Sequence, residues 1–245
     1  MTEKKGEPVA KVIARCGYCS RREAEKLIQD GKVKVNGVVI DTPLVFITDQ
    51  SIKINNKLLQ QPEKTQLWMF HKPRGYIVSN NDPENRKTIY SILPSTLPRV
   101  VPVGRLDMDT EGLLLLTNDG KLANFISHPS TAWTRQYRVK VHGFWKDIDF
   151  SKYEKKGITI NGIHYAPFKV SVEKETDSTN VWLKISVVEG RNREVRNIME
   201  NFNLKVMKLV RISFGPFHLG SLPVGEVKPI TGSALKNAIG NKFNI

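Results

Sequence analysis

Residues 104–120 decide how the fold of this chain is interpreted. Their sequence is Gly104-Arg-Leu-Asp107-Met-Asp-Thr-Glu-Gly112-Leu-Leu-Leu-Leu-Thr-Asn-Asp-Gly120. The four leucines predict a buried strand, and the acidic residues before them predict a loop. A loop fixed by rigid strands holds carboxylates where a ligand can reach them, which suits catalysis. Asp107, Asp109 and Glu111 could equally form a plain acidic turn or a magnesium loop, and the pattern alone leaves these interpretations open.

Apolar runs on both sides of this loop predict many strands and few helices. Helices are expected only at 121–127 and 193–202 in this part of the chain. Because strands and helices do not alternate regularly, we predict an α+β fold with a mainly antiparallel, mixed sheet. Strands are expected at residues 67–70, 76–79, 100–103, 113–116, 136–141, 181–188 and 205–212, with a hairpin at 158–165.

Residues 8–60 predict a separate, smaller unit built from two helices and a hairpin. Its second helix begins at a capping box, Ser20-Arg-Arg-Glu23, and ends at Gly31. The hairpin alternates apolar and polar residues around Asn36-Gly37. Seven cations in this unit predict a basic patch: Lys11, Arg15, Arg21, Arg22, Lys26, Lys32 and Lys34.

The polar segment 61–67 interrupts the apolar pattern and contains a proline. We interpret it as a linker, so that the chain divides into a domain at 8–60 and a larger domain at 68–235.

The net charge of the chain indicates a polyanionic partner. It is +14 at pH 7, with an isoelectric point near 9.8. Nucleic acid is the commonest such partner of a protein that does not enter membranes. No apolar run is long enough to span a bilayer and the N-terminus does not resemble a signal peptide, so we expect a cytoplasmic protein.

The two cysteines, Cys16 and Cys19, form a Cys-x-x-Cys pair that could indicate redox chemistry or half of a zinc site. Zinc requires two further ligands, and no nearby histidine or cysteine supplies them. We interpret both thiols as small, partly buried side chains beside a helix start.

Residues 19–37 resemble a known RNA-binding domain. Cys19-Ser-Arg-Arg-Glu-Ala-Glu-Lys-Leu-Ile28, followed by Gly31-Lys-Val-Lys-Val-Asn-Gly37, is similar to the S-four domain, first named for a ribosomal protein. The resemblance implies that the helix pair presents basic residues to RNA phosphates. Such domains occur in proteins of many functions, so they imply RNA without naming a reaction.

The larger domain resembles the RsuA/RluB family of bacterial ribosomal RNA pseudouridine synthases. The motif at 104–120 carries the resemblance, and the blocks that agree with it appear in the same order as in the family. They are Lys72-Pro-Arg-Gly75, Tyr137-Arg-Val139, Glu189-Gly-Arg-Asn-Arg-Glu-Val-Arg196 and Lys208-Leu-Val-Arg211-Ile-Ser-Phe-Gly215. The amino-acid sequence of the central motif is more similar to the RluB type, which acts on the large-subunit RNA.

This resemblance implies a role for each matched residue. Asp107 matches the catalytic aspartate, Tyr137 the tyrosine that packs against the target base, and Arg196 the basic residue that pairs with the aspartate. Arg105 matches the arginine beside the aspartate in the motif. We expect Arg191 and Arg193 to meet the RNA backbone while Arg196 turns inward.

The implied reaction explains these residue types. The bond from ribose to the ring nitrogen breaks, the uracil turns, and a carbon–carbon bond forms, so a carboxylate and an aromatic platform for a flipped base are needed. No metal or other cofactor is implied, and the expected partner of a monomeric protein is structured ribosomal RNA. Alternatives are a catalytically silent RNA-binding assembly protein, a synthase of small-subunit RNA, and a magnesium nuclease that uses the three acids.

Overall fold

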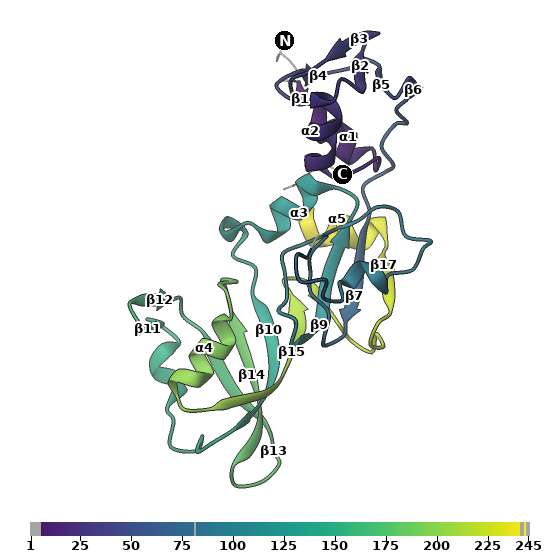
Figure 1. The fold of residues 1–245 in the computed structure, drawn as a ribbon. Coiled ribbons are helices and arrows are strands. Elements are labelled where there is room, and N and C mark those ends of the chain that lie inside the picture. The colour runs from purple at the N-terminus through teal and green to yellow at the C-terminus, as the bar shows by residue number, and fades with distance from the viewer. Residues whose placement is uncertain (1–5, 81, 241–242, 244–245) are drawn as a thin grey trace.

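The computed structural model describes residues 6–80, 82–240 and 243 (Figure 1). Its N-terminal unit has its own small core, in which Val9, Ile13, Ile28 and Val33 are fully buried. The elements of this unit are β1 (Glu7–Pro8), α1 (Val9–Arg15), α2 (Arg21–Gln29), β2 (Val33–Val35), β3 (Val38–Ile40), β4 (Phe46–Ile47), β5 (Ile52–Ile54) and β6 (Lys57–Leu58).

Two local sequence signals, a capping box and an Asn-Gly turn, form the structures that the sequence predicts in this unit. Ser20 accepts a hydrogen bond from the Glu23 amide while the Glu23 carboxylate accepts one from the Ser20 amide, which completes the capping box of α2. Asn36 and Gly37 take positive φ angles of 48° and 87°, the conformation that joins β2 to β3 in a tight hairpin.

The larger part of the chain is organised around one mixed sheet of nine strands, in which the main path is β13-β14-β10-β15-β9-β7-β17. Only β9 and β15 pair in parallel, and the remaining pairs are antiparallel. The strands are β7 (Leu67–Lys72), β8 (Val101–Pro102), β9 (Thr110–Thr117), β10 (Arg135–His142), β13 (Lys169–Glu175), β14 (Asn180–Val187), β15 (Lys205–Phe214), β16 (Phe217–His218) and β17 (Val227–Ile230).

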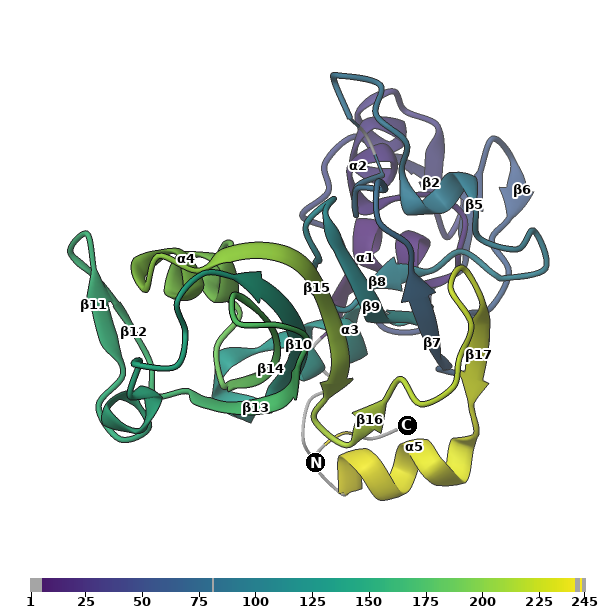
Figure 2. The ribbon, with the colours of Figure 1, turned by 90° about the horizontal axis from the view of Figure 1, so that it is seen from below.

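Helices cover the two faces of this sheet unequally. The α-helices are α3 (Gly120–Ser127), α4 (Glu194–Asn201) and α5 (Gly232–Ile239). Figure 2 shows α4 and α5 on opposite sides of β15. Short 3-10 turns at Ile89–Ser91, Pro129–Thr131 and Phe150–Tyr153, and a separate hairpin of β11 (Ile158–Ile160) with β12 (Ile163–Tyr165), complete the structure.

Strand β9 lies where both faces of the sheet are covered. Leu114 and Leu116 belong to one apolar core, which includes residues of α4, and Leu113 and Leu115 belong to the other, which includes residues of α3 and α5. All four leucines are fully buried, which explains the unbroken run of leucines in place of alternation. Asp107 lies three residues before this strand, so a strand that is buried on both faces supports it.

The two parts of the chain contact each other through polar side chains. Glu7 forms ion pairs with Arg15 in its own unit and with Lys121 in α3, each at 3.1 Å. The Thr65 hydroxyl donates to Asp119, and the Gln66 amide donates to Asn118. No helix among the described residues is long and apolar enough to cross a membrane.

The structure corrects three details of the sequence predictions. Residues 76–79 do not form a strand, because only an isolated bridge joins Ile77 to Thr88. The helix expected from Arg193 begins at Glu194, since Arg193 is the N-cap residue with a φ of 51°. The fold continues beyond residue 235, where α5 extends to the buried Ile239.

Candidate active site

One buried lysine forms hydrogen bonds to the backbone of the loop that carries Asp107. Lys72, at the end of β7, is fully buried, and its ammonium group donates to backbone carbonyls of Pro73, Asp107, Met108 and Thr110 at 3.0–3.3 Å. Burial lowers the pKa of Lys72 to about 8, although the nearby Asp107, Asp109 and Glu111 act in the opposite direction. Three of these carbonyls belong to the Asp107 loop, so Lys72 fixes its path.

Further contacts join the 72–75 turn to the same loop. The Gly75 amide donates to the Met108 carbonyl at 2.8 Å, and Arg74 lies 3.8 Å from Asp109. Gly75 takes a φ of +89°, which a side chain rarely tolerates. Two of the sequence blocks, more than thirty residues apart, therefore build one structure around Asp107.

Gly112 has a steric function at the parallel pairing of β9 with β15. It lies opposite Arg211, with a φ of +105°, and a Cβ at this position would overlap the backbone of Arg211. The glycine of the motif thus allows the two strands that flank the site to approach each other.

The predicted partner of Asp107 is present. The Nε atom of Arg196 lies 3.9 Å from a carboxylate oxygen of Asp107, and the Arg196 Nη2 atom donates to the Asp109 carbonyl at 3.1 Å. Arg196 is buried, as expected, and Asp107 remains about one-third exposed. Burial lowers the pKa of Arg196, and Arg193 contributes in the same direction, whereas Asp107 opposes both.

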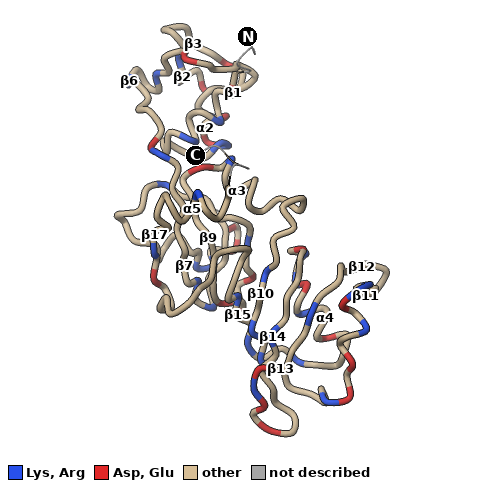
Figure 3. Tube along the Cα trace, turned by 180° about the vertical axis from the view of Figure 1, so that it is seen from behind, with Lys and Arg blue, Asp and Glu red and all other residues tan. Residues whose placement is uncertain are grey.

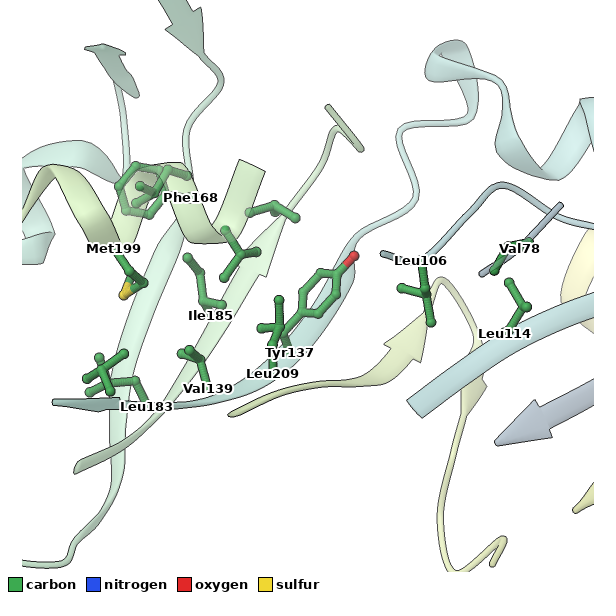
Figure 4. Close-up of a cluster of buried hydrophobic side chains, with 14 of the residues drawn as sticks. Val78, Leu106, Leu114, Tyr137, Val139, Phe168, Leu183, Ile185, Met199 and Leu209 are labelled. Carbon is green, nitrogen blue, oxygen red and sulfur yellow. The ribbon is translucent and has the colours of Figure 1, made fainter. Parts of the chain in front are cut away.

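Tyr137 and Arg105 lie on the same cleft as Asp107. Tyr137 belongs to β10 and is buried between the core of that part of the sheet and Leu106, which directly precedes Asp107 (Figure 4). Arg105 is exposed at the other end of this short segment and also lines the cleft. The four residues that the sequence analysis singled out for the reaction therefore share one cleft.

The cleft has a cationic wall. Its volume is about 590 Å³, within the range of small-ligand pockets. Six arginines line it against three acids, Asp107, Glu189 and Glu194, so the lining attracts an anion. The arginines are Arg105, Arg135, Arg191, Arg193, Arg196 and Arg211.

Four polar atoms of the cleft-lining residues are buried without a hydrogen-bond partner among the described residues. They are Thr110 Oγ1, Glu194 Oε1, Arg196 Nε and Arg211 Nη2. Buried polar atoms are normally paired. The wall of this cleft therefore keeps hydrogen-bonding capacity that the described residues do not use.

Glu194 is a cleft residue that the sequence analysis did not single out. It begins α4, is buried, and has one oxygen that accepts from the Arg191 amide at 3.2 Å. Burial raises its pKa to about 7, and the charge of Glu189 adds to this effect, while Arg135 and Arg191 oppose it. The Arg193-Glu-Val-Arg196 pattern marks a helix start in the sequence but gives no sign that this acid is buried.

The three acids proposed for a magnesium loop face three different cations. Asp107 lies near Arg196, Asp109 near Arg74, and Glu111 forms an ion pair with Lys208 at 3.0 Å. No group of three metal-ligating side chains gathers anywhere in the described part of the chain. A magnesium loop requires these carboxylates to converge, and this arrangement separates them.

The cations of the N-terminal unit divide into paired and unpaired groups. Arg15, Arg21 and Lys32 form ion pairs with Glu7, Glu25 and Asp30, and Lys34 donates to Asn56. Lys11, Arg22 and Lys26 are exposed and have no hydrogen-bond or ion-pair partner among the described residues. These three are the most available for RNA.

Cys16 and Cys19 are free thiols that pack against the small N-terminal core, each partly buried. Burial raises the pKa of both thiols, so neither resembles an activated nucleophile.

The comparisons with known proteins show the family of this chain. Residues 66–201, more than half of the chain, match the family described as RNA pseudouridylate synthase. The chain belongs to this pseudouridylate synthase family. Residues 7–43 match the S4 domain, the S-four domain expected from the sequence.

Individual relatives extend the match over nearly the whole synthase. A Rickettsia felis protein named as an RNA pseudouridine synthase is 43% identical over 230 residues, which cover 93% of this chain and 98% of the relative. A Bacillus subtilis protein named ribosomal large subunit pseudouridine synthase B is 37% identical, with 94% of each chain covered. A pseudouridylate synthase of known crystal structure shares 30% identity and a TM-score of 0.65, covering 94% of this chain and 98% of the other.

Proposed function

We propose that this pseudouridine synthase acts on ribosomal RNA, preferably of the large subunit, and uses Asp107 as its catalytic carboxylate. The observation that carries the proposal is the position of Asp107. It lies on a loop clamped by Lys72, beside a buried arginine, in a cleft that contains a buried tyrosine. The Bacillus subtilis relative, whose name specifies the large ribosomal subunit, supports the choice of RNA.

The side chains of the cleft suit an isomerisation. The bond between ribose and the ring nitrogen breaks and the sugar becomes bonded to carbon 5, which loses its proton while the nitrogen gains one, so the atoms balance without a co-reactant. Asp107 is proposed to act on the sugar or the base as nucleophile or base. Arg196 places a positive charge beside the Asp107 carboxylate, and Tyr137 offers a face to the flipped uracil.

The remaining predicted residues are proposed to hold the RNA. Arg105, Arg191 and Arg193 are exposed along the cleft, where phosphates approach. The S-four domain adds the seven cations at residues 11, 15, 21, 22, 26, 32 and 34. Because ribosomal RNA is the proposed substrate, the proposed place of action is the cytoplasm. The protein is proposed to act as a monomer.

The test is to map pseudouridine in both ribosomal RNAs of a strain that lacks this protein. The proposal expects one site in the large-subunit RNA to remain uridine, with modification restored by the wild-type chain but not by Asp107→Asn. A missing site in the small-subunit RNA would redirect the proposal to that subunit. An unchanged map would contradict ribosomal RNA as the substrate.

A further inference from the structure

One face of the main sheet is covered along only half of its width. Over β9 and β7 this face is packed under α3 and α5, where Leu113, Leu115 and Phe214 are buried. Beyond β15 the burial pattern changes. On β10 and β14 every second residue is buried, and the residues between them are partly exposed. The covered face of these two strands is packed with α4 residues, and no described helix lies on the other face.

Cations gather on this open face. Six basic residues occupy it: Lys140 and Arg138 of β10, Lys184 of β14, Lys169 and Lys174 of β13, and Lys208 of β15. Figure 3 shows Lys and Arg along β10, β14 and β15. Among the described residues, two carboxylates form ion pairs with them, Glu173 at 2.6 Å from Arg138 and Glu111 at 3.0 Å from Lys208.

The register places like charges directly opposite each other. Arg138 is paired with Lys184, and Lys140 is paired with Lys208. Such cross-strand pairs of like charge weaken a sheet. Lys140 and Lys184 also have no ion-pair partner among the described residues. An external polyanion would offset this repulsion.

An aromatic ring lies among these cations. Trp182 of β14 is directly opposite both Lys140 of β10 and Lys174 of β13, and it is partly exposed. The Arg138 guanidinium lies over its ring, 4.9 Å from the ring centroid. Cations beside an accessible aromatic ring on an open sheet are a recurrent arrangement for binding RNA, in which the cations meet phosphates and the ring stacks on a base.

We propose that the open face of β13, β14, β10 and β15 binds a second segment of RNA, apart from the nucleotide that enters the catalytic cleft. The two surfaces are distinct because they use alternate residues of the same strands. Tyr137 and Val187 line the cleft, whereas Arg138, Lys140 and Lys184 point to the opposite side. An RNA large enough to pass around the edge of the sheet reaches both. The proposal rests on ribosomal RNA being the substrate, since a short hairpin would not extend so far.

The test compares two RNAs with charge variants of the full chain. Lys140→Gln with Lys184→Gln should weaken binding to a long ribosomal RNA fragment several-fold and reduce the slope of log Kd against log salt by about 1.8, that is about 0.9 for each lost phosphate contact. Binding and turnover of a short stem–loop that carries the target uridine should stay unchanged. Trp182→Leu should weaken binding to the long RNA without changing the slope, because stacking releases no counterions.

Matched variants separate this surface from a general effect of charge. Lys155 and Lys156 are exposed and lie outside the four strands. Changing both to Gln removes the same amount of charge. The slope of log Kd against log salt should then stay nearer to the wild-type value than it does in the Lys140 and Lys184 variant. Equal effects of the two double variants, or an unchanged affinity of the Lys140 and Lys184 variant for the long RNA, would overturn the proposal. Either result is independent of whether the enzyme still modifies the stem–loop, which reports on the proposed function.

Discussion

Lys72 is a single buried side chain that holds the backbone of the Asp107 loop. Its ammonium group donates to four carbonyls, three of them in the loop of Asp107. Lys72→Met should leave these carbonyls unpaired and allow the loop to shift, and displacement by about 1 Å can cost about a hundredfold in rate. Single-turnover rates on ribosomal RNA test this, with the exposed Lys87→Met as the control. A Lys72→Met enzyme of normal rate would show that the loop holds its shape unaided.

Glu194 should make the stability of the protein depend on pH. Burial raises its pKa in the folded state from an ordinary 4.5 to about 7. The folded state therefore keeps a proton that the unfolded chain releases, so the stabilisation is complete below pH 4.5 and is lost as the pH rises through 7. The pKa of Glu194 thus differs by about 2.5 between the folded and unfolded states, which corresponds to about 3 kcal/mol of the free energy of unfolding.

Glu194→Gln removes this titration and tests the assignment. The variant should gain stability relative to the wild type at pH 8 and little at pH 4, as measured by chemical unfolding at both values. Glu200→Gln, on the exposed side of the same helix, should leave the pH dependence unchanged. Parallel stability curves for wild type and Glu194→Gln across this range would mean that the carboxyl is ionised without penalty.

The sequence identified the residues of the cleft that belong to recognisable blocks, and it missed those whose role depends on burial. Asp107, Tyr137 and Arg196 line one cleft, and their roles there stay predictions. The Lys72 block is recognisable in the sequence, but the role of its side chain is not, because the acceptors lie up to 38 residues further along the chain. The burial of Glu194 is not visible in the sequence for the same reason, since its neighbour Arg135 comes from another strand.

At the scale of elements, the parallel pairing of β9 with β15 depends on Gly112. A Cβ there would overlap the Arg211 backbone, and the φ of +105° is unfavourable for any other residue. Gly112→Ala should therefore lower the free energy of unfolding by about 2–4 kcal/mol. Thermal or chemical denaturation measures this loss. Gly120→Ala, where a Cβ meets open space at the start of α3, should change stability by less than about 0.5 kcal/mol. Similar losses in both variants would remove the steric explanation.

Elements with strong local signals were predicted, and those that depend on distant partners were not. The capping box of α2 and the hairpins at 36–37 and 161–162 carry their own turn chemistry. Strand β13 was missed because it is an edge strand with six of its seven residues exposed, so its sequence shows no buried face. Residues 76–79 contain apolar side chains that suggest a strand, but they find no ladder to join.

At the scale of the whole molecule, we expect the N-terminal domain to provide much of the affinity for RNA and the larger domain to carry out the reaction. The residues of the two large cores all come from beyond residue 60, so removal of residues 1–60 leaves these cores complete. The truncated protein should bind RNA more weakly and with a flatter salt dependence, because fewer phosphates displace counterions. Its turnover at saturating RNA should fall far less. Binding across a salt series, together with single-turnover rates, measures both quantities.

Two outcomes would contradict this division. An unchanged salt slope would mean that the seven cations of the S-four domain face away from RNA. A folded truncated protein that is inactive even at saturating RNA would mean that the Glu7–Lys121 contact, or another part of the domain, helps to shape the catalytic cleft.

The central claim is that the carboxylate of Asp107 performs the chemistry, and one substitution tests it most directly. Asp107→Asn keeps the size of the side chain and removes its charge. In a tritium-release assay on ribosomal RNA labelled at carbon 5 of uracil, this variant should show no detectable turnover while it binds RNA as tightly as the wild type. Asp109→Asn, two residues away and facing Arg74, is the matched control and should remain active. Turnover of Asp107→Asn within about tenfold of the wild type, well short of the hundredfold or greater loss expected for a catalytic group, would contradict the account.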